Sequence, residues 1–151
     1  MSDSLPFRRT YPLEVRFRDL DAMGHVNNAV FFTYLEEARL RYTRDVLEPL
    51  PPADRPPGFI VASARLDYRL PLFLGDTLDI GVAVAWFGRT SYGLAYEVRS
   101  RAQHALAAVA ETVQVVYDYK AKRAIELPPS FREAVTRFEG RAIPAREARP
   151  A

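Results

Sequence analysis

Apolar and polar residues alternate along the first clearly patterned segment of the chain. From Tyr11 to Phe17 the apolar residues fall on odd positions, and charged residues take most of the even ones. A period of two is typical of a strand with one buried face. If the strand keeps its phase, Asp19 and Asp21 continue that face and point inward. A carboxylate is costly there unless it is paired or used in chemistry.

The period changes after Gly24. Apolar residues then follow helical spacing from Val26 to Tyr42. Asn27 or Asn28 is a suitable N-cap, and the five prolines of EPLPPADRPPG, residues 48–58, must end the helix and form a linker. The pattern therefore predicts a helix of about 20 residues, long enough to be the main packing element.

Four strand-like stretches and a short helical pattern follow the linker. The strands are expected at residues 59–70, 77–87, 92–100 and 104–119, and the helix at 128–140. One early helix followed by consecutive strands indicates an α+β fold, in which the helix covers one face of an antiparallel sheet. A single helix cannot shield both faces and both edges, so we expect oligomerisation through an edge strand or an uncovered face.

The composition narrows the possible classes. The 151 residues, 48% hydrophobic and 26% charged, predict one domain over 1–151, with a core at about 11–139 and a frayed tail at 140–151. A net charge of +2 gives no argument for a nucleic-acid partner. The lack of cysteine excludes disulfides, thiol nucleophiles and Cys-ligated zinc. No apolar leader and no stretch of roughly 18 apolar residues is present, so we expect a cytoplasmic protein without a membrane partner.

The string DLDAMGHVNN, residues 19–28, joins the first strand to the helix. Aspartate, asparagine and glycine are typical of turns and caps, so the string can be read as a connection only. It also suits acyl transfer. Amides at a helix N-terminus stabilise a developing oxyanion, and a nearby carboxylate can attack the carbonyl or deprotonate water. A metal site of Asp19, Asp21 and His25 has less support, because no second histidine lies nearby and the spacing matches no known ligand pattern.

The segment FRDLDAMGHVNNAVFFTYLEEAR, residues 17–39, closely resembles the signature of hotdog-fold thioesterases of the 4-hydroxybenzoyl-CoA thioesterase type. YRLPLFLGD at 68–76 and FGRTSYGL at 87–94 fall where that family has similar segments, and the likeness spans 11–119. The resemblance implies a hotdog fold, with a five-stranded antiparallel sheet around one long helix. It also implies an acyl-CoA thioesterase that forms homodimers or homotetramers with interface active sites. Coenzyme A enters as part of the substrate, and no metal or other cofactor is expected.

The resemblance also assigns roles to residues of the 19–28 string. Asp21 takes the position of the catalytic carboxylate, as nucleophile or as general base. The backbone amide of Asn28 matches the donor that polarises the thioester carbonyl, while Gly24 and His25 shape the loop with Val26. In place of Met23 the similar plant acyl-carrier-protein thioesterases have an asparagine. A thioether cannot donate as that amide does, so the resemblance favours a mechanism in which Asp21 works with helix amides.

Substrate contacts are expected from three further segments. Ser63, from another subunit, is a candidate contact near the thioester, or simply an outward-facing strand residue. Arg89, Thr90 and Ser91 suit the phosphates of coenzyme A, or form a solvated hairpin. The acyl pocket is expected to include aromatic residues of the helix, which otherwise belong to the core: Phe31, Phe32 and Tyr34.

Three other activities and the role of Asp19 stay open. The chain could bind or sense acyl thioesters without hydrolysing them, or act on acyl carrier protein. A hydratase or dehydratase of this fold uses a differently spaced Asp and His, which Asp21 and His25 do not match. Asp19 could raise the pKa of Asp21, pair with Arg18 or Arg39, or cap a turn.

Overall fold

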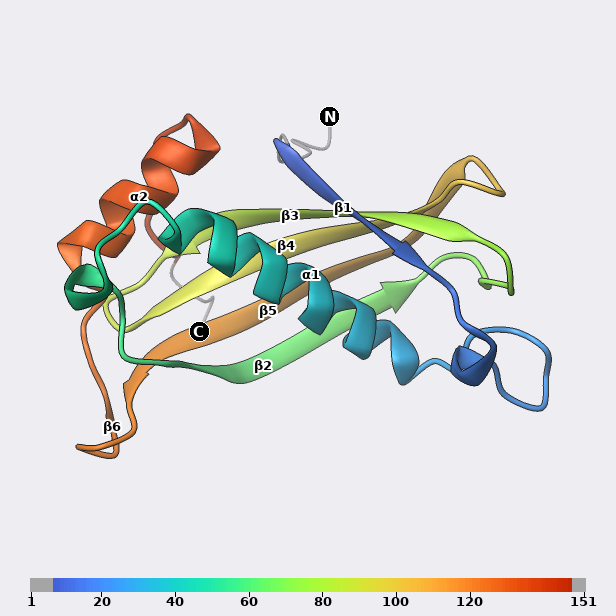
Figure 1. The fold of residues 1–151 in the computed structure, drawn as a ribbon, viewed down its shortest axis with the longest axis horizontal. Coiled ribbons are helices and arrows are strands. Elements are labelled where there is room, and N and C mark those ends of the chain that lie inside the picture. Colours follow the sequence, from blue (N-terminus) through green and yellow to red (C-terminus); the bar gives the residue numbers. More distant parts are fainter. Residues whose placement is uncertain (1–6, 148–151) are drawn as a thin grey trace.

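A long helix lies across one face of a curled antiparallel sheet (Figure 1). The computed structural model describes residues 7–147. The helices are α1, Val30–Leu47, and α2, Pro129–Glu139, and short 3-10 turns occupy Phe17–Asp19 and Pro52–Asp54. The strands in chain order are β1 Arg9–Glu14, β2 Phe59–Tyr68, β3 Thr77–Phe87, β4 Ser91–Ser100, β5 Ala105–Asp118 and β6 Arg123–Ala124.

The sheet confirms the expected α+β architecture of a long helix, an antiparallel sheet and a short C-terminal helix. Its strands follow the order β1-β3-β4-β5-β2, and the two-residue β6 extends the hairpin after β5. The first strand of the chain thus pairs with β3, and β2 crosses over to pair with the far side of β5. Consequently β2 forms one edge of the sheet, and no further strand of residues 7–147 pairs with its outer side.

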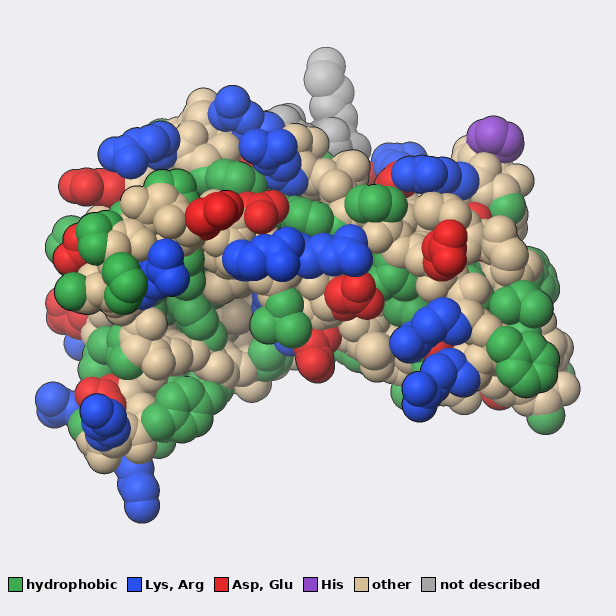
Figure 2. Space-filling model, in the orientation of Figure 1, with side chains coloured by type: hydrophobic (Ala, Val, Ile, Leu, Met, Phe, Trp, Pro, Cys, Tyr) green, Lys and Arg blue, Asp and Glu red, His purple; other side chains and the backbone are tan. Residues whose placement is uncertain are grey.

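The core lies between α1 and the sheet. Strand β3 contributes Leu78, Ile80, Val82 and Val84 to it, as its alternation predicts. The buried side of α1 carries residues at helical spacing: Phe31, Tyr34, Leu35, Ala38, Tyr42 and Val46. Burial of one such large apolar side chain contributes about 1.5–3 kcal/mol, so this interface is the main source of stability. Charged side chains of both signs cover the outer side of α1 (Figure 2), where Glu37 and Arg41 pair at 2.9 Å.

The first strand ends earlier than its alternation predicts. After Glu14 the chain leaves the sheet and makes the 3-10 turn Phe17–Asp19. The expected inward position of Phe17 is therefore wrong, because its side chain is 79% exposed. The Arg16 amide donates to the Asp19 carboxylate at 2.9 Å, and such a local side-chain bond offers the backbone an alternative to the strand. Asp19 is still buried, but the turn and not the strand phase directs it inward.

The N-cap of the main helix lies one residue after the nearest expected cap, Asn28. This N-cap is Ala29, whose side chain makes no capping hydrogen bond. The predicted cap at Asn27 or Asn28 is therefore wrong in position. Asn27 nevertheless serves the helix start, because its Oδ1 accepts from the Ala29 amide at 2.9 Å.

The segment after α2 packs against the sheet, contrary to the frayed tail expected from residue 140. The Phe87 amide donates to the Pro144 carbonyl at 2.9 Å, and the Arg146 amide donates to the Phe87 carbonyl at 2.9 Å. The Arg146 guanidinium lies 4.5 Å from the Trp86 ring centroid. Strand β1 pairs with β3 only as far as Val82. The segment after α2 pairs with the same side of β3 beyond that point, at Phe87. The expected tail beyond residue 147 lies outside the described residues.

No helix within residues 7–147 is long and apolar enough to cross a membrane.

Candidate active site

The loop between β1 and α1 forms a small hairpin. Leu20 and Val26 bridge antiparallel, and the Asp21 amide donates to the His25 carbonyl at 3.1 Å. Gly24 makes the reversal with a φ of +83°, a conformation that favours glycine. The Val26 amide then donates to the carbonyl of Leu72 at 2.8 Å. This bond ties the hairpin to the loop between β2 and β3.

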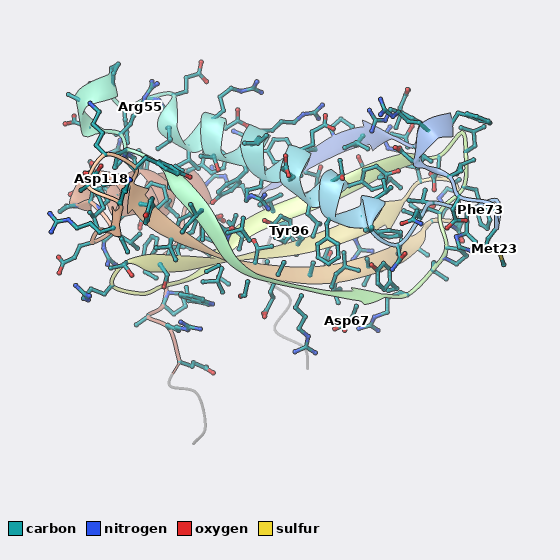
Figure 3. The ribbon with its side chains drawn as sticks, turned by 90° about the horizontal axis from the view of Figure 1, so that it is seen from below. Met23, Arg55, Asp67, Phe73, Tyr96 and Asp118 are labelled. Carbon is teal, nitrogen blue, oxygen red and sulfur yellow. The ribbon has the colours of Figure 1, made fainter. Side chains whose placement is uncertain are left out.

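The Asp21 carboxylate is held by its own loop and by Asn27, three residues before α1. Oδ1 accepts from the Met23 amide at 2.9 Å, and Oδ2 accepts from Asn27 Nδ2 at 3.3 Å. Since Asn27 also accepts from the Ala29 amide, one side chain connects the carboxylate to the start of α1. The Met23 side chain itself is 78% exposed and lies at the end of the molecule (Figure 3).

Asp21 faces a cavity of about 460 Å³ between the hairpin, the helix start and the end of β2. The cavity brings together three of the expected catalytic residues, Asp21, His25 and Asn28, and the expected acyl contact Phe31. Its remaining lining residues are Val26, Tyr68, Arg69, Leu70 and Pro71. The cavity therefore has a carboxylate at one side and largely apolar walls, a combination suited to an acyl thioester.

Asn28 lines this cavity, and its two backbone groups differ in their hydrogen bonding. Within residues 7–147 its amide donates to no other group, whereas its carbonyl accepts from the Tyr68 hydroxyl at 2.7 Å. The adjoining helix has no acidic residue in its first turn. An unpaired amide beside the positive end of a helix dipole is a suitable donor for an oxygen that gains negative charge.

His25 has a structural contact of its own. The ring is half-buried, and its Nδ1 lies 3.2 Å from the Val26 carbonyl oxygen. A protonated Nδ1 would donate to that carbonyl and hold the ring in place. This contact fits the orienting role expected for His25 in the loop.

Asp19 belongs to the core beneath the site. Its side chain is 2% exposed, and the Tyr34 hydroxyl donates to Oδ2 at 2.7 Å. Burial alone would raise its pKa, but hydrogen bonds from the Arg16 amide, Tyr34 and the Arg16 guanidinium outweigh it and lower the pKa of Asp19. Of the expected alternatives, the structure shows a turn cap paired with Arg16, and neither Arg18 nor Arg39 is its partner.

Two of the expected aromatic contacts point elsewhere in the single chain. Tyr34 is fully enclosed in the core, where it contacts Asp19, and does not line the cavity. Phe32 lies on the exposed side of α1. The acyl wall of the described chain is thus built by Phe31 together with residues from β2 and the loop after it.

The expected coenzyme A contacts lie away from the cavity in the single chain. Arg89, Thr90 and Ser91 form the β3–β4 connection at the opposite end of the sheet, the end that Arg55 and Asp118 mark in Figure 3. Arg89 there pairs with Glu126 at 3.4 Å. Ser63 lines a different cavity, of about 510 Å³, beside Trp86 and Arg146.

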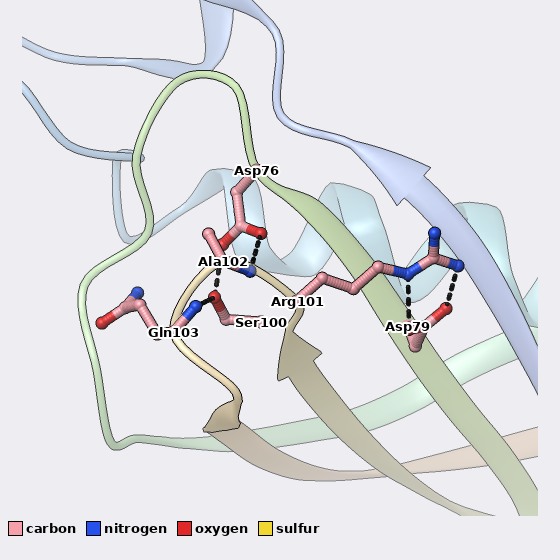
Figure 4. A network of polar contacts seen from close by, with 6 residues as sticks. All are labelled: Asp76, Asp79, Ser100, Arg101, Ala102 and Gln103. Atoms are coloured by element: carbon pink, nitrogen blue, oxygen red, sulfur yellow. Dashed lines mark hydrogen bonds and ion pairs between the residues drawn. The ribbon is translucent and has the colours of Figure 1, made fainter.

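The wall formed by Tyr68, Arg69, Leu70 and Pro71 was not predicted, although its segment is part of YRLPLFLGD. A polar network holds the loop that carries it (Figure 4). Gln103 donates to the Pro71 carbonyl at 2.7 Å. The buried Asp76 carboxylate accepts from the Ser100 hydroxyl at 2.5 Å and from the Ala102 amide at 3.0 Å. The β4–β5 turn thereby fixes the β2–β3 loop beside the cavity.

The described part of the chain contains no cluster of three or more His, Cys, Asp or Glu side chains that could hold a metal ion. Asp21 and His25 are near one another, but Asp19 is directed into the core. The three residues considered for a metal site are therefore not arranged as one ligand set.

Known proteins resemble this chain in sequence, in fold or in both. Residues 15–135 match the family model described as the Thioesterase-like superfamily. The long-chain acyl-CoA thioesterase FadM of Escherichia coli (strain K12) is 28% identical over 121 residues, which cover 80% of this chain and 92% of that protein. A thioesterase from Thermus thermophilus, crystallised with coenzyme A and Zn, is 36% identical with a TM-score of 0.78, covering 89% of this chain and 96% of that one.

A more distant structure shows the fold alone. The 1,4-dihydroxy-2-naphthoyl-CoA thioesterase Slr0204 from Synechocystis is 21% identical, with a TM-score of 0.72 and coverage of 84% of this chain and 94% of that one.

Proposed function

This chain belongs to the Thioesterase-like superfamily and is a thioester hydrolase, and from that premise we propose that it hydrolyses an acyl-CoA to a free carboxylic acid and coenzyme A, with Asp21 as its catalytic carboxylate. One observation carries the proposal. Asp21 and Asn28 line the same cavity, whose other walls are largely apolar, and the Asn28 amide donates to no other group within residues 7–147. Such a cavity can hold a thioester between a base or nucleophile and an oxyanion donor.

The general-base route assigns a task to each group. Asp21 takes a proton from water, and the water oxygen forms a bond to the thioester carbonyl carbon. The carbonyl oxygen gains negative charge and accepts a hydrogen bond from the Asn28 amide, a donor of a kind worth about 3–4 kcal/mol in transition-state stabilisation. The carbon–sulfur bond then breaks, and coenzyme A leaves as a thiolate that takes up the proton.

The nucleophilic route uses the same groups. An Asp21 oxygen bonds to the carbonyl carbon, the thiolate leaves, and water then hydrolyses the resulting anhydride. Both routes need the carboxylate ionised and oriented, and the Met23 amide and Asn27 side chain supply that orientation. In both routes the Asn28 amide donates a hydrogen bond to the carbonyl oxygen as that oxygen gains negative charge.

A second copy of the chain is proposed to complete the site. The outer edge of β2 is unpaired within residues 7–147, and Val61 on it is 47% exposed. If two β2 edges pair antiparallel about a two-fold axis, the Tyr68 end of one strand lies beside the Phe59 end of the other. The Phe59 end is also the end of the sheet that carries Arg89, Thr90 and Ser91 (Figure 1).

This pairing supports the expected coenzyme A contacts. The second subunit's Arg89–Ser91 turn would approach the cavity of the first, and its Ser63 would lie near the shared strand edge. The Arg89–Glu126 pair is exposed on both sides and such pairs are weak, so the guanidinium can exchange its partner for a phosphate. The proposed assembly is a homodimer that can associate further into a homotetramer. A cytoplasmic location stays a prediction from the sequence.

Release of free thiol from aromatic and aliphatic acyl-CoAs tests the proposal. Wild type should turn over at least one class, and Asp21→Asn should reduce kcat by about 1,000-fold or more, because it removes the base or nucleophile. Circular dichroism and light scattering must show the same fold and assembly for both proteins. Equal turnover by the two would contradict the role of Asp21.

If the protein only binds or senses acyl thioesters, wild type should release no thiol in this assay. Tight binding of acyl-CoA without turnover on any member of the panel would favour this alternative. Turnover confined to acyl carrier protein thioesters would instead change the carrier and leave the role of Asp21 in place.

A further inference from the structure

Tyr68 contacts the proposed catalytic loop from the opposite wall of the cavity. It is the last residue of β2, and its hydroxyl donates to the Asn28 carbonyl at 2.7 Å. Its ring packs edge-on against Phe31, with ring centroids 5.0 Å apart and an interplanar angle of 83°. Tyr68 thereby ties a strand at the sheet edge to the two residues of the helix start that border the cavity.

This contact is one of three hydrogen bonds that hold the turn before α1, and it is the one that comes from another element of the fold. No other donor of residues 7–147 reaches the Asn28 carbonyl. The preceding peptide plane, which carries the Asn28 amide, is held on its carbonyl side by the Val30 amide at 2.9 Å. The Ala29 N-cap offers no side-chain acceptor of its own. The following peptide plane carries the Asn28 carbonyl and the Ala29 amide, and it is held by Tyr68 on its carbonyl side and by Asn27 Oδ1 on its amide side, at 2.9 Å. The two planes meet at the Asn28 Cα, so Tyr68 helps to set the direction of the Asn28 amide.

We propose that Tyr68 is a positioning residue, which holds the Asn28 amide in the direction needed to donate to the thioester oxygen. This inference rests on the proposed hydrolysis. The Tyr68 hydroxyl proton is already engaged by the Asn28 carbonyl, so the residue acts through Asn28 and Phe31 and not on the carbonyl of the substrate. An oxyanion donor contributes most when its direction is fixed before the reaction begins.

Tyr68→Phe is the test, because it removes one oxygen and keeps the ring against Phe31. We expect kcat to fall by about 10- to 100-fold, the range that small displacements of catalytic groups produce. Binding of an acyl-CoA thioether analogue, in which a methylene replaces the carbonyl, should change by less than about twofold because that ligand makes no oxyanion contact.

Tyr11→Phe is the matched control. The Tyr11 hydroxyl also ties a strand to α1, donating to Asp45 at 2.9 Å, but it does so from β1 and near the other end of the helix. Tyr11→Phe should keep wild-type kcat even where it lowers the unfolding midpoint.

The possible results separate the two proposals. Asp21-dependent turnover that is equal in wild type and Tyr68→Phe overturns the positioning role alone. An equal loss in kcat and in analogue affinity also overturns it, because it indicates a general loss of the cavity. Absence of Asp21-dependent turnover in wild type overturns the proposed function, and the positioning role with it.

Discussion

Asp19 and Asp21 are two residues apart, yet their carboxylates have different partners. Asp19 accepts from Tyr34 and Arg16 in the core, whereas Asp21 faces the cavity with Asn27 beside it. The sequence identified both as inward carboxylates in an apolar alternation. The resemblance assigned catalysis to Asp21, but the alternation could not show what holds Asp19, because the 3-10 turn that redirects the chain depends on a hydrogen bond between Arg16 and Asp19.

Asp19→Asn tests the structural role. The lowered pKa means that Asp19 contributes stability in full above its unfolded pKa, near 3.8, and loses it as pH falls through the folded-state pKa. We expect the variant to be about 1–2 kcal/mol less stable than wild type at pH 7. Urea unfolding should show this difference narrowing as the pH falls below 3.8 and through the lower folded-state pKa of Asp19.

The same variant has an activity control. At a temperature where it is folded, Asp19→Asn should keep most of the wild-type turnover, in contrast to Asp21→Asn. A stability difference independent of pH, or a loss of turnover as deep as that of Asp21→Asn, would refute this separation of roles.

At the scale of elements, the alternation of apolar residues predicted the strands well, and helical spacing predicted α1. The expected site residues Asp21, His25, Asn28 and Phe31 also lie together, because they come from one continuous segment. Tyr68 and its neighbours could not be found in this way. Their position beside α1 follows from β2 pairing with β5 at the sheet edge, and periodicity does not give strand order.

The loop after β2 owes its position to Asp76, which is 4% exposed. Asp76→Ala leaves the buried Ser100 hydroxyl and the Ala102 amide without their acceptor, and we expect a loss of about 2–4 kcal/mol in the free energy of unfolding. Chemical denaturation measures this loss.

Asp79→Ala is the comparison for that experiment. Asp79 lies three residues away and pairs with Arg101 through two bonds of 2.8 Å (Figure 4), but the arginine is exposed. Its loss should cost no more than about 1 kcal/mol. Similar losses in the two variants would show that burial of Asp76 is not what stabilises the loop.

At the scale of the whole molecule, the unpaired edge of β2 is the feature that a second copy can satisfy. The sequence predicted that one helix cannot cover both faces and both edges of the sheet, and the structure shows that β1 and β2 are the edge strands within residues 7–147. Of the two, β2 borders the cavity, through Tyr68. The sequence could not identify β2 as this edge strand, because its position depends on the crossover by which β2 pairs with β5. The same crossover places Tyr68 beside the cavity.

Val61→Lys tests the edge pairing. A lysine on an edge strand opposes pairing with another strand, so the variant should be monomeric where wild type is dimeric or larger. Light scattering after size-exclusion chromatography measures the mass. Leu74→Lys, which adds the same charge to an exposed apolar position in the β2–β3 loop, should keep the wild-type mass. A monomeric wild type, or an unchanged assembly in Val61→Lys, would contradict edge pairing through β2.

The packing of the segment after α2 against β3 can be followed by the fluorescence of the protein itself. Trp86 is the single tryptophan of the chain, and the Arg146 guanidinium lies over its ring. Indole emission responds to a nearby cation and to water, so its wavelength reports whether this segment is seated on β3. Detachment can thus be followed without a label, and separately from global unfolding, which circular dichroism records.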